Sequence, residues 1–367
     1  MIKVMSIFGT RPEAIKMAPV VKALEKRKEI ESIVCVTAQH RQMLDQVLET
    51  FEIKPDYDLN IMQSGQTLSD ITTRALLGLQ EVIAKEKPNI VLVHGDTTTT
   101  FAGALAAFYN QVDIGHVEAG LRTYDKYAPY PEEMNRQMVD CMTDMCFAPT
   151  NLSKDNLLKQ HIDESKIYVT GNTVIDAMKT TVVRDYSHEV FDWIGNDRMI
   201  LLTAHRRENL GDPMRRIFKA IKRIVDEFDD VKVVYPIHMN PKVRDVANEI
   251  FADCKRVRLI EPLEVFDFHN FQNKSFLIMT DSGGIQEEAP SLGKPVLVLR
   301  DTTERPEGIE AGTLKLVGTN ENIIYEETKK LLTDSGEYEK MSKASNPYGD
   351  GHASERIVDA IIEKYNQ

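Results

Sequence analysis

Short runs of apolar residues alternate along the chain with longer segments in which apolar residues recur every three or four positions. The longer segments, such as residues 13–27 and 214–228, have the spacing of amphipathic helices. The short runs predict six strands in the first half of the chain, at residues 2–9, 31–38, 89–96, 112–119, 145–150 and 167–172. Six more are predicted in the second half, at residues 199–205, 231–238, 257–262, 275–283, 295–301 and 313–318.

Strands that are apolar almost throughout, and that alternate with helices, are typical of parallel sheets covered on both faces. A chain of 367 residues is long for one hydrophobic core and suggests two domains. We therefore expect an α/β protein with two Rossmann-like, doubly wound parallel sheets. The change between them falls near residues 170–176, which predicts domains at 1–171 and 172–352, and an amphipathic segment at 353–367 follows.

In open α/β sheets, ligands bind outside the carboxyl ends of the strands, so polar residues at those ends indicate a binding site. A protein that needed only stability would have no reason to place an acid, a histidine or an arginine at nearly every strand end. Here these ends carry Gly9-Thr10-Arg11, Gly95-Asp96, Glu118-Ala119-Gly120, His205-Arg206-Arg207, His238 and Asp281-Ser282-Gly283-Gly284.

The overall charge narrows the class of ligand. Lys plus Arg is 45 and Asp plus Glu is 57, for a net charge of −12. This balance argues against general binding of nucleic acid, which needs surplus cations. An anionic ligand would have to be held by local cations and backbone amides.

Several common site types are not expected from the sequence. No GxGxxG or Walker A sequence follows a predicted strand, so we expect no dinucleotide cofactor. The cysteines show no zinc spacing and no metal-ligand cluster is found, and Cys35 and Cys146 lie in apolar runs that predict buried thiols. No apolar window has the length of a membrane span and no signal peptide is recognised, so we expect no membrane association and a cytoplasmic protein.

The turn at Ser282-Gly283-Gly284 is the best candidate for an anion site, because bare amides at a helix start attract phosphate. Glu288 lies one turn further along the predicted helix. A carboxylate there would repel phosphate but could accept hydrogen bonds from two vicinal hydroxyls. The combination predicts a ligand with a diphosphate and a ribose, with Arg305 as a further cation. The other interpretation of Glu287 and Glu288 is ordinary acidic enrichment near a helix start.

Other strand-end residues have both a structural and a functional interpretation. Asp96 is either a helix N-cap or a catalytic acid. Glu118 ends an apolar strand, where a carboxylate is costly unless it is paired. Glu132 begins a predicted helix with Arg136 as its i,i+4 partner, and His205 is followed by two arginines.

Seven segments of the chain carry a resemblance to a known family: residues 9–20, 94–100, 116–123, 131–140, 203–209, 280–308 and 346–357. Together they resemble the non-hydrolysing UDP-N-acetylglucosamine 2-epimerases, and the resemblance extends over essentially the whole chain. It implies a GT-B arrangement of the two domains, with substrate in an interdomain cleft and the helix at 353–367 returning to the N-terminal domain. It also implies a homodimer.

The resemblance also implies roles for individual residues. The residues implied to serve in or beside the chemistry are Asp96, Glu118, Glu132 and His205. Those implied to bind substrate are Arg11, Lys16, Phe268 beside the uracil, Ser282, Gly283 and Gly284 on the diphosphate, Glu288 on the ribose, and Arg305. A second UDP-N-acetylglucosamine molecule, bound as an activator, would contact Gln39, Gln42, Glu132, Arg206 and His238. Gly65 stands where some family members carry a basic residue, so activation is left open.

The chemistry implied is inversion at C2, which converts UDP-N-acetylglucosamine to UDP-N-acetylmannosamine. No carbonyl acidifies the C2 proton, so an enzyme must either oxidise the sugar with NAD or eliminate UDP across C1–C2. The missing dinucleotide fingerprint favours elimination to 2-acetamidoglucal and re-addition of UDP. Three alternatives are a GT-B glycosyltransferase, which needs no base at C2, a hydrolysing epimerase, and a non-catalytic sugar-nucleotide sensor, which needs no acids beside its ligand.

Overall fold

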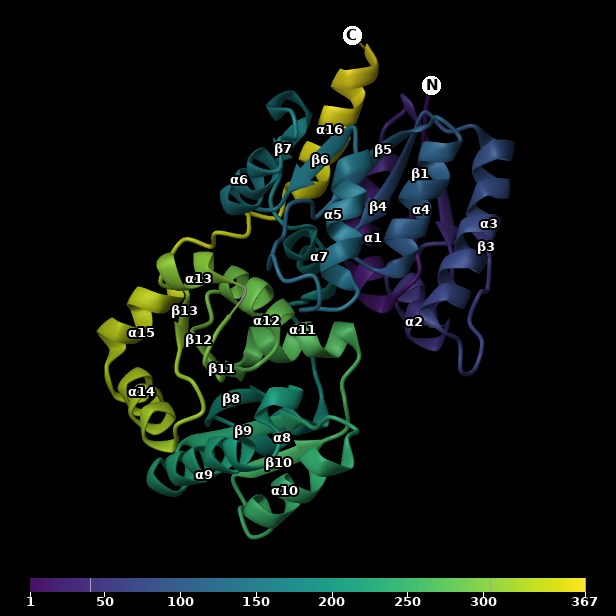
Figure 1. Ribbon diagram of the computed structural model, residues 1–367. Helices are drawn as coiled ribbons and strands as arrows, with labels where there is room; N and C mark the ends of the chain where they lie inside the picture. Colours follow the sequence, from purple (N-terminus) through teal and green to yellow (C-terminus); the bar gives the residue numbers. More distant parts are fainter. Residues whose placement is uncertain (40, 304, 367) are drawn as a thin grey trace. The chain divides into compact units, whose positions relative to one another are not determined.

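The computed structural model describes residues 1–39, 41–303 and 305–366, without the side chain of Gln42. The chain divides into two compact units, and each is an α/β structure (Figure 1). Unit 1 comprises Met1–Thr180 together with Tyr348–Gln367, and unit 2 comprises Thr181–Pro347. Among the described helices, none combines the length and the apolar character that a membrane span requires.

Unit 1 is built on a parallel sheet, which has seven strands in the described residues, in the order β3-β2-β1-β4-β5-β6-β7. All six strands predicted in this half are present. The two-residue β3, at Tyr57–Asp58, was not predicted, because two residues are too few to give a pattern. The other strands are β1 (Ile2–Phe8), β2 (Ile30–Val36), β4 (Ile90–His94), β5 (Asp113–Val117), β6 (Met145–Ala148) and β7 (Ile167–Val169).

Helices cover this sheet. The helices of unit 1 are α1 (Arg11–Glu25), α2 (Arg41–Thr50), α3 (Leu68–Glu86), α4 (Thr98–Tyr109), α5 (Glu132–Met142), α6 (Asn151–Lys159), α7 (Thr173–Thr181, whose last residue lies in unit 2) and α16 (Ala353–Asn366). The C-terminal α16 packs against α1 (Figure 1). Its start is held by the Asp176 carboxylate, which accepts hydrogen bonds from the amides of Ala353 and Ser354 at 3.2 and 2.8 Å.

Unit 2 contains a second parallel sheet, in which the described strands have the order β10-β9-β8-β11-β12-β13. These are the six strands predicted for this half: β8 (Arg198–Thr203), β9 (Val231–Pro236), β10 (Val257–Ile260), β11 (Leu277–Thr280), β12 (Val296–Val298) and β13 (Leu314–Leu316). The helices are α8 (Glu189–Ile194), α9 (Asp212–Glu227), α10 (Pro241–Phe251), α11 (Val265–Lys274), α12 (Gly283–Glu288), α13 (Pro306–Glu310), α14 (Glu321–Thr333) and α15 (Ser335–Ser342).

Alternation along β8 shows why its sequence is apolar at nearly every position. Ile200 and Leu202 belong to one hydrophobic core of unit 2, on one face of the sheet. Met199 and Leu201 belong to a second core on the opposite face. Because successive side chains point to opposite faces, a strand covered by helices on both sides must be apolar throughout. The predicted α/β class with parallel sheets is therefore confirmed.

Each sheet has a point where the strand order reverses. In unit 1 this point lies between the neighbouring strands β1 and β4, and in unit 2 between β8 and β11. Helices that follow the two strands at such a point lie on opposite faces, which leaves a crevice at the carboxyl ends. The segments that leave these four strands are residues 9–11, 95–96, 204–206 and 281–284. They include most of the strand-end polar residues that the sequence singled out.

The predicted buried thiols are confirmed. Cys35 and Cys146 are free and buried within β2 and β6. Burial raises the pKa of the Cys35 thiol to about 12. A thiol that stays protonated is a poor nucleophile, so Cys35 is a core residue.

Candidate functional site

Glu118 is the most strongly held carboxylate at the strand ends of unit 1. It follows β5 with φ +69°, a left-handed conformation that is uncommon outside glycine. The Lys16 ammonium lies 2.5 Å from Oε1, the Nε2 atom of His94 lies 3.1 Å from Oε2, and Asn172 donates to Oε1 at 3.3 Å. Burial alone would raise the pKa of Glu118, but the charges of Lys16 and His94 hold it well below its usual value. Glu118 is therefore a buried anion, held by polar side chains around it.

Glu13 ties the turn after β1 to the start of α4. Its carboxylate accepts hydrogen bonds from the amides of Gly9 and Thr10 at 3.2 and 2.8 Å, and from the hydroxyls of Thr97 and Thr100 at 2.8 and 3.2 Å. Burial raises the pKa of Glu13, and the Thr10 and Thr97 hydrogen bonds offset part of that rise. Glu13 lies three residues after Thr10, the N-cap of α1, which is the spacing of a capping box.

Asp96 is not a helix N-cap. Thr97 caps α4, and its hydroxyl accepts from the Thr100 amide. The Asp96 carboxylate is partly exposed and lies 2.8 Å from Arg136 Nη2. The predicted ion pair between Glu132 and Arg136 is wrong, because the guanidinium turns toward Asp96 and only its Nε approaches the Glu132 backbone oxygen, at 3.4 Å.

Two consecutive glutamates at the start of α5 have different surroundings. Glu133 is fully buried and accepts hydrogen bonds from the amides of Thr123 and Tyr124, at 3.0 and 3.1 Å, and from the Gln137 side chain at 2.7 Å. These contacts fasten the loop before α5. Glu132 is partly exposed at the helix start. Glu133 is thus structural, and Glu132 is the one available to a ligand.

The remaining candidates of unit 1 are less constrained. Arg11 is the first residue of α1 and is partly exposed. Gln39 accepts a hydrogen bond from the Thr99 hydroxyl at 3.2 Å. The predicted role of Gln42 lies outside the described side chains. Gly65, at φ +72°, has open space where a side chain would stand.

In unit 2, two guanidinium groups flank the glycine turn after β11. Ser282 is the N-cap of α12, and Gly283 is its first residue. The Nη2 atoms of Arg206 and Arg305 each lie 3.8 Å from the position that a Cβ on Gly283 would take. A side chain at Gly283 would therefore fill the space that the two cations border, and glycine leaves it open to a ligand.

The two glutamates of α12 do not both face this space. Glu287 is buried, and its Oε1 accepts a hydrogen bond from Arg305 Nε at 2.5 Å, so it orients the arginine. Glu288 Oε1 lies 3.5 Å from the position of a Cβ on Gly284. One carboxylate is neutralised by a cation, and the other stands beside the second glycine of the turn.

Helix α11 supplies the surroundings of Glu288. The Gln272 amide donates to Glu288 Oε2 at 2.6 Å, and His269 Nε2 lies 3.7 Å from the same oxygen. Phe268, on the same helix, is partly buried and packs against the core. Helix α11 thus carries a partly exposed aromatic ring, and its Gln272 holds the Glu288 carboxylate of α12 by a hydrogen bond.

Asp281 holds the turn after β8, which carries His205. Its Oδ2 accepts hydrogen bonds from the backbone amides of His205 and Arg206, both at 2.9 Å, and from the Asn209 side chain at 3.0 Å. The His205 ring stacks on the exposed ring of His238, with centroids 5.3 Å apart. Burial lowers the pKa of His205, and the nearby Asp281 charge opposes this in part. His205 is therefore neutral at pH 7.

The structure thus brings the predicted residues together within each unit. In unit 1 it pairs Lys16 with Glu118, and α5 carries both Glu132 and the Arg136 that binds Asp96. In unit 2 the turn at 282–284, Arg206 and Arg305 converge.

The sequence analysis assigned no role to Glu287, His94 or Asn172, and it named Asp281 only as a strand-end residue. A carboxylate directly after a buried strand was the available signal for Asp281.

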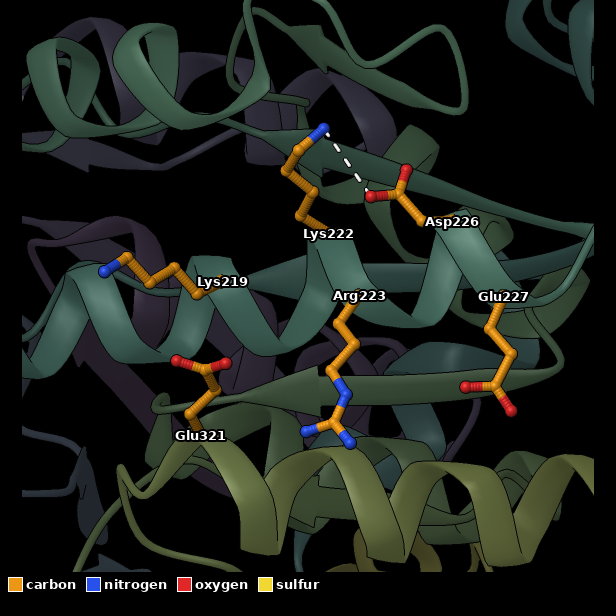
Figure 2. A pocket seen from close by; sticks show the side chains of 6 residues that line it. All are labelled: Lys219, Lys222, Arg223, Asp226, Glu227 and Glu321. Carbon is orange, nitrogen blue, oxygen red and sulfur yellow. Dashed lines mark ion pairs between the residues drawn. The ribbon is translucent and has the colours of Figure 1, made fainter.

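A separate charged cavity lies on unit 2, beside α9 (Figure 2). Its volume is about 480 Å³, and its lining includes the ion pair of Lys222 and Asp226, 3.7 Å apart. Figure 2 shows the lining residues Lys219, Lys222, Arg223, Asp226, Glu227 and Glu321. None of the residues predicted from the sequence is among them.

The chain is similar over nearly its whole length to known proteins. The family model described as UDP-N-acetylglucosamine 2-epimerase matches residues 22–362. A UDP-N-acetylglucosamine 2-epimerase of Bacillus subtilis is 67% identical over 364 residues, which are 99% of this chain and 96% of that protein.

Several of the similar solved structures hold a nucleotide or a sugar nucleotide. The UDP-GlcNAc 2-epimerase of Neisseria meningitidis bound to UDP-GlcNAc is 50% identical, with a TM-score of 0.89, over 99% of this chain and 100% of that one. The UDP-GlcNAc 2-epimerase of Methanocaldococcus jannaschii, in complex with UDP-GlcNAc and UDP, is 35% identical, with a TM-score of 0.80, over the same shares of the two chains.

Proposed function

Because this chain belongs to the UDP-N-acetylglucosamine 2-epimerase family, we propose that it interconverts UDP-N-acetylglucosamine and UDP-N-acetylmannosamine. The reaction removes the C2 proton and the UDP group to give 2-acetamidoglucal. UDP then adds back at C1 while a proton is delivered to the opposite face of C2, which inverts the configuration there. The observation that carries this proposal is the different chemistry of the two units. Unit 2 has two guanidinium groups around a glycine turn, with a carboxylate beside it. Unit 1 has three carboxylates with different surroundings, two of them after neighbouring strands and one at the start of α5.

Unit 2 would hold the UDP group. The amides of the turn at 282–284 and the guanidiniums of Arg206 and Arg305 would bind the diphosphate. Glu288 would accept hydrogen bonds from the ribose hydroxyls, and Phe268 would contact the uracil. The pairing of Glu287 with Arg305 supports this, because it removes one of the two negative charges of α12 from the diphosphate.

Unit 1 would move the protons. The proposed acids and bases are Asp96, Glu118 and Glu132. A positioned acid or base typically raises the reaction rate by ~10²–10⁴-fold. Lys16 keeps Glu118 ionised, so its carboxylate carries no proton at neutral pH. Asp96 and Glu132 are partly exposed and so accessible to substrate.

Departure of UDP places negative charge on its β-phosphate. Arg11, Lys16 and the neutral imidazole of His205 are the proposed partners of that charge, together with the amides at 282–284. Preorganised donors aimed at developing charge are usually the largest single contribution to catalysis. The three amide and side-chain donors on Asp281 Oδ2 support a fixed position for the His205 turn.

The proposal also includes two features of the family resemblance. A second UDP-N-acetylglucosamine molecule would act as an activator, with Gln39, Arg206 and His238 among its contacts, and the protein would be a homodimer. Activation predicts that the protein consumes UDP-N-acetylmannosamine slowly by itself and faster when a small amount of UDP-N-acetylglucosamine is added. A consumption rate that added UDP-N-acetylglucosamine only lowers, as a competing ligand would, contradicts the activator. A monomeric mass in solution contradicts the dimer.

The products test the proposed reaction. Incubation of the purified protein with UDP-N-acetylglucosamine, followed by separation of the nucleotides and sugars, should give UDP-N-acetylmannosamine at a constant total of sugar nucleotide. Accumulation of free N-acetylmannosamine with equal UDP would show a hydrolysing enzyme. An unchanged substrate that still raises the melting temperature would show a binding protein without this activity.

A further inference from the structure

A buried network of charged side chains lies beneath the proposed proton-transfer groups of unit 1. His116, on β5, places Nδ1 2.6 Å from Asp140 Oδ1, and Asp140 is on α5. Arg122 Nη2 donates to Asp140 Oδ2 at 2.5 Å. The side chains of all three residues have no exposed surface. Charges so deeply buried are costly unless they are paired, and here Asp140 is paired with both His116 and Arg122.

The network reaches the turns that carry the proposed acids. His116 Nε2 lies 2.7 Å from the backbone oxygen of Gly95, the residue before Asp96. The Gly120 amide, two residues after Glu118, donates to Asp140 Oδ2 at 3.3 Å. The helix that carries Asp140 begins at Glu132. One group of buried residues therefore connects all three segments.

The hydrogen-bond partners determine what His116 donates. A carbonyl oxygen only accepts, so Nε2 must carry a proton toward Gly95. Burial alone would raise the pKa of Asp140, but His116 and Arg122 hold it below its usual 3.8, so its oxygen also accepts. Nδ1 thus faces the Asp140 carboxylate, and Nε2 is the donor to the Gly95 carbonyl.

Gly95 needs such a restraint more than another residue would. It lies at φ +68°, where glycine is free of the steric cost that other residues meet. Its amide donates to the Val117 oxygen at 2.9 Å, and its carbonyl accepts from His116. Both polar groups of the peptide turn are thus bound to β5, and the direction in which Asp96 leaves the turn follows from them.

We propose that His116 is a positioning residue for the proton-transfer step, acting through its hydrogen bond to the Gly95 carbonyl. This rests on the proposed epimerase activity. Asp140 orients the His116 ring and links it to the Glu118 turn and to α5. Loss of the Gly95 bond lets the turn rotate, and a displacement of about 1 Å at a reacting group can cost ~10²-fold in rate.

Two amide substitutions separate the two bonds of His116. The Asn side-chain nitrogen falls where Nδ1 stands, so His116→Asn keeps a donor to Asp140 and loses the one to Gly95. The Gln side-chain nitrogen reaches the place of Nε2, so His116→Gln keeps the donor to Gly95 and loses the one to Asp140. Asp140→Asn is a third probe, because a neutral His116 can still donate from Nε2 to Gly95 while Nδ1 accepts from the new amide.

The measurement is kcat and KM for UDP-N-acetylglucosamine, with the Kd for UDP and the melting temperature of each variant. His116→Asn should lower kcat by ~10²-fold, with KM and the UDP Kd within about twofold of wild type. His116→Gln and Asp140→Asn should each keep a kcat at least about tenfold above that of His116→Asn. A purely structural role would instead make kcat follow the melting temperature across the three variants.

The inference is overturned if His116→Asn keeps the wild-type kcat, or if Asp140→Asn, folded and binding UDP normally, loses as much as His116→Asn. If neither His116 variant folds, kcat of Asp140→Asn is compared with that of wild type. This variant preserves the ring and the Gly95 bond, so a loss of ~10²-fold in its kcat would overturn the inference. A wild-type protein that forms no UDP-N-acetylmannosamine would contradict the proposed function itself, and so is distinguished from a failure of His116 as a positioning residue.

Discussion

The ammonium of Lys16, on the second turn of α1, lies 2.5 Å from the carboxylate of Glu118, at the end of β5. Their side chains are only 15% and 9% exposed. Little water reaches either charge, so each depends on the other for its stability in the ionised form. The pair also joins the first helix of the sheet to a strand end more than a hundred residues away in the sequence.

Loss of the Lys16 charge should destabilise the protein. We expect Lys16→Met to lower the free energy of unfolding by about 3–5 kcal/mol, because it leaves Glu118 buried without its nearest cation. Denaturant unfolding followed by circular dichroism measures this. Lys22→Met is a matched control on the same helix, since Lys22 pairs with the exposed Glu25 and should cost only about 0–1 kcal/mol.

The double variant checks the reason for that loss. Lys16→Met combined with Glu118→Gln removes both charges, so it should be more stable than Lys16→Met alone. If the double variant is instead less stable by the sum of the two single losses, the two residues are not coupled.

Acid should destabilise unit 1 through its paired carboxylates. The folded-state pKa values of Glu118 and Asp140 lie below the usual 4.5 and 3.8, so the unfolded chain takes up protons first as pH falls. The stability that they contribute is present above those usual values and is lost as pH falls through the folded pKa values. Urea unfolding from about pH 6 to about pH 3 should show this loss, with a shallower slope for Glu118→Gln. An equal slope in the variant would contradict the assignment.

Asp96 should be required for chemistry and dispensable for nucleotide binding. Asp96→Asn keeps the shape of the side chain but removes its ability to take a proton. We expect exchange of the C2 proton with solvent to be abolished while the rise in melting temperature on adding UDP stays largely intact, because the proposed UDP site lies in unit 2. Exchange at the wild-type rate would exclude Asp96 from the proton-transfer step.

Substitutions at Glu288 and Arg206 should show which part of UDP each residue binds. Glu288→Gln should weaken UDP binding, by about 1–3 kcal/mol for a charged hydrogen-bonding group, and leave inorganic pyrophosphate binding unchanged or stronger. Arg206→Gln should weaken both, because its guanidinium borders Gly283. Isothermal titration calorimetry with each ligand measures the difference. Equal losses for UDP and pyrophosphate in Glu288→Gln would place that carboxylate away from the ribose.

Hydrophobic periodicity predicted the strands well because buried parallel strands leave a strong pattern. Ile200 and Met199, on opposite faces of β8, are both apolar for this reason. The pattern could not reveal β3, which has two residues, Tyr57 and Asp58, and only Tyr57 packs against a core. Strand ends could be named as candidate site positions because the rule depends only on strand order and direction.

Pairings across the fold were harder to predict than positions. The i,i+4 rule joined Arg136 to Glu132, but a tertiary partner, Asp96, takes the guanidinium instead. Local spacing could not anticipate this, because Asp96 is 40 residues away in the sequence. The roles of Glu287 and Asp281 likewise depend on contacts with Arg305 and with the His205 turn, which no sequence pattern encodes.

The most direct test of the proposed epimerisation is proton NMR of UDP-N-acetylglucosamine incubated with the protein in D₂O, without added NAD or metal. Removal of the C2 proton to a carboxylate that exchanges with solvent predicts deuterium at C2 and the appearance of UDP-N-acetylmannosamine. UDP-N-acetylmannosamine that forms with its C2 proton fully retained would contradict solvent-exchangeable proton transfer. No conversion and no exchange, with UDP binding still measurable, would contradict the proposed activity as a whole.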